Sequence, residues 1–348
     1  MHAWLLAPDN FTPPSRTPWG GTAIVDRYKR DLGLAPARVG ESWELSAGPE
    51  FPSRVAHGPL LSEVVREEPD FALGEEAPRG NTSLLVKLLD AEDNLSVQIH
   101  PSDDYAGLAS DECGKPESWY VLDAAPGAGL YLGIAEGASP EAMRAALSTG
   151  GDVSKLLAFV PVAQGDFFVV EAGTAHAIGR GVTLVEPQVV RPGRKGVTYR
   201  YWDWNRRYDA RGNASATGDA RPLHVDHALA VTDWARARGD AFLREIRVRS
   251  GGADPTAPMA ATTLCGPSKA ALRSKDLEVT KVSGRGSVAL SARGRLRALT
   301  VVEGSVDVVG ARGVVTVARG RTAAIAARAD VTLVSEAGAH ALLSCAAS

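Results

Sequence analysis

Four residues of this chain have side chains and spacings that suit a divalent metal ion. Gln98 and His100 lie two positions apart in an alternating apolar run, so on a β-strand they project from the same face. Glu117 precedes a further apolar run, and His176 follows a strand-like run that breaks at Gly173. One amide oxygen, one carboxylate and two imidazoles form a mixed donor set, which suits zinc or another first-row divalent ion.

A single histidine is more often an ordinary core or surface residue than a metal ligand, and the chain has seven histidines. The spacing around His176 strengthens the metal interpretation. Gly165–His176 resembles the motif Gly-x5-Pro-x-Gly-x2-His of the cupin superfamily, with Glu171 in place of the proline. In cupins this histidine is a metal ligand on a barrel strand, and the resemblance implies the same role for His176.

Several blocks of the chain resemble a more specific family, the type I mannose-6-phosphate isomerases (phosphomannose isomerases) of the short bacterial form. In chain order they are SLLVKLLDAEDNLSVQIHPSDDYA, GKPESWYVLDAAPGA, GDFFVVEAGTAHAIG and TYRYWDWNR. The shorter segments WGG, GESWELS and RPLHVDHAL fit the same family. The resemblance is close over about residues 10–235 and loose beyond them.

This resemblance implies an aldose–ketose isomerase that interconverts mannose 6-phosphate and fructose 6-phosphate through an enediol intermediate. The implied metal ligands, for one zinc ion per chain or another divalent metal, are Gln98, His100, Glu117 and His176. The implied substrate-binding residues are Lys87, Lys115 and Arg200. The implied catalytic residues are Lys115, Glu186 and Arg200.

The isomerisation requires a polarised carbonyl and a base that moves a proton between C1 and C2. A metal with an open position can act as the Lewis acid, and a lysine or arginine can stabilise the developing oxyanion. Glu186 and Lys115 are both candidates for the base, and the sequence does not rank them.

Each of the three basic residues also has a structural interpretation. Lys87 could extend its stem along a strand edge, and Lys115 could simply pair with the carboxylate of Glu117. Arg200 is flanked by aromatic residues and could stack on Trp202 or Trp204. Two other functions also stay open, an iron-holding cupin oxygenase and a metal-binding sugar-phosphate sensor without turnover.

The chain departs from the family between Glu186 and Arg200. The segment Arg191–Gly196 reads RPGRKG, and Gly196 stands where the family has an acidic residue four positions before the arginine. The extra basic residues could extend a phosphate site or form a solvated loop, and both interpretations remain open.

Composition restricts the partners. The net charge of −3 gives no general attraction to nucleic acid or to an anionic membrane, so we expect neither as a partner. The resemblance implies a small sugar phosphate as the partner molecule. Three widely spaced cysteines favour a reducing cytoplasm over a disulfide framework. No signal peptide or apolar run of ~20 residues is apparent. The expected state is a monomer or a homodimer.

The expected fold is mainly β, with two jelly-roll (cupin) barrels and a few helices inserted or packed outside. Residues 1–238 are expected to form the metal-binding catalytic domain and residues 239–348 a degenerate cupin-like domain without metal. Helical patterns cover residues 23–33, part of 60–73, 139–147 and 222–238. In the last of these, His224 and His227 are expected to be solvated or to cap the helix.

Overall fold

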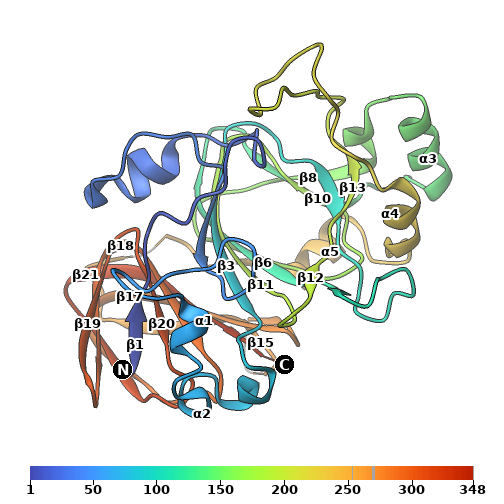
Figure 1. Cartoon of the computed structure of the whole chain (residues 1–348). Coiled ribbons are helices and arrows are strands. Elements are labelled where there is room, and N and C mark those ends of the chain that lie inside the picture. Colours follow the sequence, from blue (N-terminus) through green and yellow to red (C-terminus); the bar gives the residue numbers. More distant parts are fainter. Residues whose placement is uncertain (253, 269–270, 348) are drawn as a thin grey trace.

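The computed structural model describes residues 1–252, 254–268 and 271–347 and confirms a mainly β chain. Within these residues the strands form three large sheets and one short pair (Figure 1). The six-stranded sheet runs in the order β14 (Arg247–Arg249), β9 (Asp166–Val170), β6 (Glu117–Ala124), β11 (Val182–Val189), β3 (Leu84–Ala91) and β2 (Glu41–Leu45). The five-stranded sheet runs in the order β13 (Tyr199–Trp202), β4 (Val97–Ile99), β10 (His176–Ile178), β7 (Gly129–Ile134) and β8 (Leu157–Pro161).

The third sheet has eight strands and contains most of the chain after residue 259. Its path is β1 (Ala3–Leu5), β20 (Thr322–Ile325), β18 (Arg297–Gly310), β21 (Val331–Ala346), β17 (Leu277–Leu290), β15 (Ala260–Gly266) and β16 (Leu272–Arg273), with β19 (Gly313–Ala318) paired to β18. The short pair joins β5 (Glu112–Cys113) and β12 (Lys195–Gly196) in parallel.

Two apolar layers separate the three sheets. The alternation of β6 shows the arrangement: Trp119 and Val121 belong to one buried cluster, whereas Tyr120 and Leu122 belong to another. The first cluster joins the six-stranded sheet to strands of the five-stranded sheet, and the second joins it to the eight-stranded sheet. Because both faces of the six-stranded sheet are buried, β3, β9 and β11 are largely apolar, and the polar residues within them stand out.

Helices cover the outer side of the five-stranded sheet. Val97 and Ile99 of β4 pack in one cluster with residues of α3 (Pro140–Ser148) and α4 (Val225–Val231), which lie beside β13 in Figure 1. The other helices are η1 (Ile24–Tyr28), η2 (Arg30–Leu32), α1 (Leu61–Val64), α2 (Pro69–Ala72), η3 (Gly74–Arg79), η4 (Val153–Leu156) and α5 (Gly239–Ile246). No helix among the described residues is long and apolar enough to cross a membrane.

The predicted helices are present but mostly shorter than expected. The segment 139–147 is helical, and Ser139 caps it by accepting a hydrogen bond from the Ala142 N–H at 3.2 Å. The predicted helix 222–238 is limited to α4, because the chain becomes extended at Thr232. The segment 23–33 forms a π-helical turn and a 3₁₀ turn and ends at Gly33 in the left-handed conformation, as predicted.

Two strands pair with strands from the other side of the predicted domain boundary at residue 238. β1 pairs with β20 in the eight-stranded sheet, while β14 pairs with β9 in the six-stranded sheet. The first strand of the chain thus belongs to the sheet of the C-terminal half, and a strand from beyond residue 238 belongs to a sheet of the N-terminal half. The division into residues 1–238 and 239–348 stays a prediction.

Candidate metal centre and substrate cavity

Strand register brings the polar residues of the six-stranded sheet onto one face. Glu186 of β11 lies opposite Lys87 of β3, and Gln188 lies opposite Glu117 of β6. Positions two apart along a strand share a face, so the four side chains gather on one side of the sheet. The same strand face carries Trp119, which packs in the apolar layer toward the five-stranded sheet.

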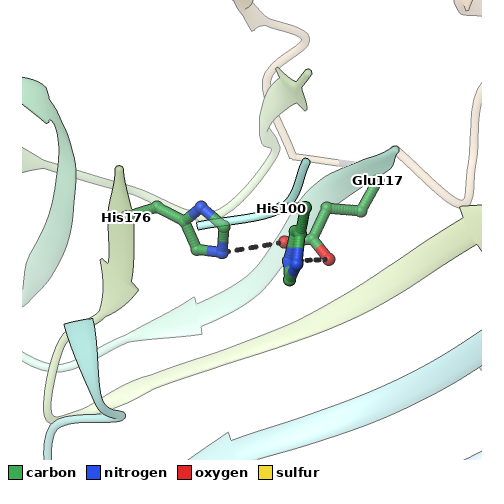
Figure 2. Close-up of side chains that lie close together, drawn as sticks. All are labelled: His100, Glu117 and His176. Atoms are coloured by element: carbon green, nitrogen blue, oxygen red, sulfur yellow. Dashed lines mark ion pairs between the residues drawn. The ribbon is translucent and has the colours of Figure 1, made fainter. Parts of the chain in front are cut away.

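The facing sheet supplies the histidines. His176 begins β10 and lies opposite Gln98 of β4, while His100 directly follows β4. The side chains of His100, Glu117 and His176 are buried, and one candidate ligand atom from each lies within 4.8 Å of the others. Figure 2 shows both rings directed at the carboxylate, with each Nε2 atom 3.3 Å from a Glu117 oxygen.

Backbone carbonyls fix the tautomer of both rings. His100 Nδ1 lies 2.9 Å from the Val197 carbonyl, and His176 Nδ1 lies 2.8 Å from the Thr174 carbonyl. A carbonyl only accepts, so each Nδ1 carries the proton and each Nε2 directs a lone pair at Glu117. Burial lowers the pKa of both rings, that of His176 to about 4, so both are neutral near pH 7.

These residues fit a metal ion. Both Nε2 atoms and one Glu117 oxygen have no hydrogen-bond partner among the described residues, although all three atoms are buried. Two lone pairs facing a carboxylate repel it unless a cation lies between them. Histidines that donate Nδ1–H to carbonyls while presenting Nε2 are the usual arrangement in protein metal sites.

Gln98 lies where a fourth ligand could reach the cluster. It neighbours His176 across the strand pair and lines the adjoining cavity. No hydrogen bond is found for its side chain within the described ranges, so the amide is available. Its role as a ligand stays a prediction.

Gln188 is a functional candidate that the sequence analysis missed. Its Nε2 donates to Glu117 at 2.7 Å, and it is fully buried. The bond holds the carboxylate in place beside the histidines. The signal in the sequence was present, because Glu186 and Gln188 are two polar residues at alternate positions of an otherwise apolar run.

Lys87 lies in the interior of the sheet between two carboxylates. Its Nζ is 3.5 Å from Glu186 and 3.7 Å from Glu41, and its side chain is 9% exposed. Burial lowers its pKa, but the two carboxylates outweigh burial and raise it, so Lys87 stays charged. β3 is flanked by β11 and β2, so the lysine is not at a sheet edge.

Glu186 has the environment of a group that can gain and lose a proton near neutral pH. Burial and the nearby Glu117 charge raise its pKa to about 7. The Trp119 Nε1–H donates to one carboxylate oxygen at 3.0 Å, and Lys87 lies beside the other. The orientation of the carboxylate is therefore fixed, while its protonation state can change near neutral pH.

Lys115 shares the face of Glu117, as predicted, and its Nζ lies 3.4 Å from the Glu117 carboxylate. Burial would raise the pKa of Glu117, but the charge of Lys115 holds it well below the ordinary value. Gly196 lies against the stem of Lys115: a Cβ added there would be 3.1 Å from its Cδ atom. The missing acidic side chain at position 196 thus leaves room for this lysine.

A cavity of about 1120 Å³ adjoins the cluster. The predicted site residues that line it are Lys87, Gln98, Lys115, Glu186 and Arg200. His100, Glu117 and His176 lie behind this wall, and Gln188 belongs both to the wall and to the cluster. The arrangement can hold a polar molecule against a metal ion while carboxylates and lysines surround it.

Arg200 is a half-buried cation with neutral hydrogen-bond partners. Its Nε donates to the Ser96 hydroxyl at 3.2 Å, and its Nη1 donates to the Pro222 carbonyl at 2.9 Å. Burial and the charge of Arg221 lower its pKa to about 10. No carboxylate pairs with it and no aromatic ring lies beneath it within the described part of the chain. The remaining N–H groups can bind an anion from the cavity.

The basic segment Arg191–Gly196 forms part of the cavity rim and is held by acidic neighbours. The Nε of Arg191 donates to Asp103 at 2.6 Å, and Lys195 lies 3.1 Å from Asp111. Arg194 donates to the Glu112 carbonyl at 3.3 Å. Two of the three charges are therefore compensated, and all three side chains are largely exposed.

Comparison with known proteins supports the predicted resemblance. The model of the phosphomannose isomerase type I catalytic domain matches residues 15–120. A probable mannose-6-phosphate isomerase of Bacillus subtilis is 36% identical over 221 residues, which cover 61% of this chain and 64% of the relative. The mannose-6-phosphate isomerase of Streptococcus mutans is 36% identical over 217 residues, covering 61% and 63%. The aligned region thus spans just under two thirds of these curated relatives.

Solved structures extend the likeness to the whole chain. The crystal structure of the mannose 6-phosphate isomerase from Bacillus subtilis has a TM-score of 0.75 at 25% identity and covers 99% of both chains. A putative mannosephosphate isomerase from Archaeoglobus fulgidus shares the fold, with a TM-score of 0.70 at 22% identity over 99% and 98% of the two chains. Sequence and fold together confirm the predicted resemblance: the chain is similar to mannose-6-phosphate isomerases, and its residues 15–120 match the type I catalytic domain.

Proposed function

We propose that this protein is a metal-dependent aldose–ketose isomerase that interconverts mannose 6-phosphate and fructose 6-phosphate. The observation that carries the proposal is the pair of neutral histidines that present Nε2 lone pairs to Glu117 beside a cavity lined by Arg200. A metal ion would bind the histidines and Glu117, and an anionic sugar would bind Arg200. The names of the relatives favour an isomerase over the oxygenase and the sensor.

The proposed ligands are Gln98, His100, Glu117 and His176. Zinc is the first choice, because two neutral imidazoles, a carboxylate and an amide oxygen match its borderline preference. When bound, the metal would supply a Lewis acid for the oxygens on C1 and C2. Gln188 would keep the Glu117 carboxylate oriented, as it does in this structure.

Glu186 is our candidate for the group that moves the proton between C1 and C2. Its pKa of about 7 suits a base that must accept and return a proton near neutral pH. Lys87 and the Trp119 N–H hold the carboxylate at the cavity wall. Lys115, the alternative base, lies 3.4 Å from Glu117 and is better placed to stabilise negative charge on the enediol.

Arg200 would bind the phosphate, which is remote from the reacting carbons. Ser96 and Pro222 fix the guanidinium through neutral bonds and leave its charge uncompensated. Binding energy from the phosphate would then orient C1 and C2 at the metal. Lys87 already forms ion pairs with Glu41 and Glu186, so its predicted contact with the phosphate has less support than that of Arg200.

The test is coupled detection of fructose 6-phosphate formed from mannose 6-phosphate. The purified protein should turn over the sugar phosphate, lose activity after dialysis against a chelator and regain it with Zn²⁺ or another divalent ion. Absence of turnover in the metal-replete protein would refute the isomerase proposal. A cytoplasmic location and a monomer or homodimer complete the proposal.

A further inference from the structure

The cavity wall beside Arg200 contains the imidazole of His224. The His224 backbone N–H donates to the Arg200 carbonyl at 2.8 Å, and the Arg200 backbone N–H donates to His224 Nδ1 at 3.1 Å. These two bonds hold the ring against the free edge of β13, whose other edge pairs with β4. His224 therefore replaces a strand partner at this position.

The bond from Arg200 fixes the protonation of the ring. A backbone N–H can only donate, so Nδ1 of His224 must be unprotonated. Burial and the charges of Arg200 and His227 also lower its pKa, which keeps the ring neutral near pH 7. The single proton is then on Nε2, which has no partner among the described residues, and the ring is a donor at the cavity wall.

The same short segment also fixes the guanidinium. The Pro222 carbonyl accepts from Nη1 of Arg200, and His224 follows two residues later. The neighbouring Arg221 is bound by both oxygens of Asp203, at 2.7 and 2.6 Å, so its charge is already compensated. Arg200 and His224 are thus adjacent donors with capacity left for an anion.

We propose that His224 is a further substrate-binding residue, whose Nε2–H donates to the phosphate group that Arg200 binds. The inference rests on the proposed function, because the phosphate belongs to its substrate. The two residues differ in chemistry: Arg200 supplies charge, whereas His224 supplies a neutral and directional donor. His227, three positions later, stacks on Tyr199 at 4.8 Å and bonds Tyr105 at 2.9 Å, and it is exposed.

Two substitutions separate the donor from the support that the ring gives to Arg200. His224→Asn can keep an oxygen near the Nδ1 position but places no donor where Nε2 lies. His224→Gln can place an amide N–H near the Nε2 position. His227→Asn is the matched control, since His227 is not among the residues that line the cavity.

His224→Asn should raise KM for fructose 6-phosphate about tenfold with kcat nearly unchanged, because it removes one hydrogen bond to a charged group far from the reacting carbons. His224→Gln should recover much of this loss, and His227→Asn should match wild type. An unchanged KM in His224→Asn would overturn the inference. So would equal losses in both His224 variants with equally lowered melting temperatures, which would identify a structural support.

A binding measurement keeps the inference separate from the isomerase proposal. Calorimetric titration with fructose 6-phosphate compares wild type, His224→Asn and His227→Asn without requiring turnover. If wild type binds but does not isomerise the sugar, the proposed reaction fails, while weaker binding by His224→Asn alone still supports the donor role. Equal affinities of wild type and His224→Asn would refute that role in either case.

Discussion

Replacing Arg200 by alanine tests whether a phosphate completes the bonds of its guanidinium. The side chain has five N–H donors, and the structure shows single bonds to Ser96 and Pro222. The remaining donors can make two bonds to phosphate oxygens. At about 1.5 kcal/mol for each hydrogen bond to a charged group, Arg200→Ala would lose about 3 kcal/mol of transition-state binding, or about 10²-fold in kcat/KM.

Lysine at the same position should restore only part of this loss. Its ammonium keeps the charge but cannot bind Ser96, Pro222 and two phosphate oxygens in the planar arrangement of a guanidinium. We expect Arg200→Lys to remain about tenfold below wild type. Steady-state kinetics with mannose 6-phosphate gives the ratio. Arg207→Ala is the control, because Arg207 is exposed and its side chain donates, among the residues that the structure describes, only to the Gly218 carbonyl.

The interpretation requires that metal content and melting temperature stay near wild type. Arg200→Ala removes hydrogen bonds to the neutral groups of Ser96 and Pro222, so we expect only a small change in the free energy of unfolding. A nearly normal kcat/KM in a folded Arg200→Ala protein would refute the phosphate role. Unfolding of that variant together with Arg200→Lys would instead identify a structural arginine, and the basic segment 191–195 would become the phosphate candidate.

Three further predictions concern the proposed metal site and the buried carboxylate of Asp203. His100→Ala and His176→Ala should each lose most of the bound metal by elemental analysis, and full occupancy in both would refute the ligand set. Gln188→Leu should weaken metal affinity about tenfold or more by releasing Glu117, measured by competition with a chelator, whereas unchanged affinity would make Gln188 a packing residue. Burial would raise the pKa of Asp203, but Arg221 and Arg206 lower it, so its stabilising effect is present above the unfolded pKa of about 4 and disappears as pH falls through the lower folded value. Asp203→Asn should therefore cost roughly 3 kcal/mol in the free energy of unfolding at pH 7 and progressively less below pH ~4, and a cost independent of pH would contradict this account.

The sequence was most informative where chemistry interrupts an apolar pattern. His100, Glu117 and His176 stand out because each is polar at a position that a buried strand would otherwise fill with an apolar side chain, and the structure brings the three together. Lys87 stands out for the same reason. The mainly β class follows from the alternation and the frequent glycine turns, which are local properties of the chain.

The remaining features depend on long-range pairing that the sequence does not encode locally. Gln188 was missed because its partner Glu117 lies 71 residues away and only the register of β11 with β6 joins them. His224 takes the N-cap position of α4, in line with one of its two expected roles, but its contact with Arg200 was missed because it forms across a polar loop. Helix 222–238 was overestimated because Thr232 bonds Tyr201 and the Ala228 carbonyl, so the helix ends there.

The sharing of β6 between two apolar layers limits how the protein could be shortened. A truncated chain that ends near residue 120, where the family match stops, would lose the second half of this strand. A chain that ends before the eight-stranded sheet would leave Tyr120, Leu122 and their neighbours exposed to water, and such a sheet face promotes aggregation. A shortened version of this protein would therefore require a redesigned polar surface on the back of the six-stranded sheet, rather than simple removal of the half that carries none of the proposed ligands.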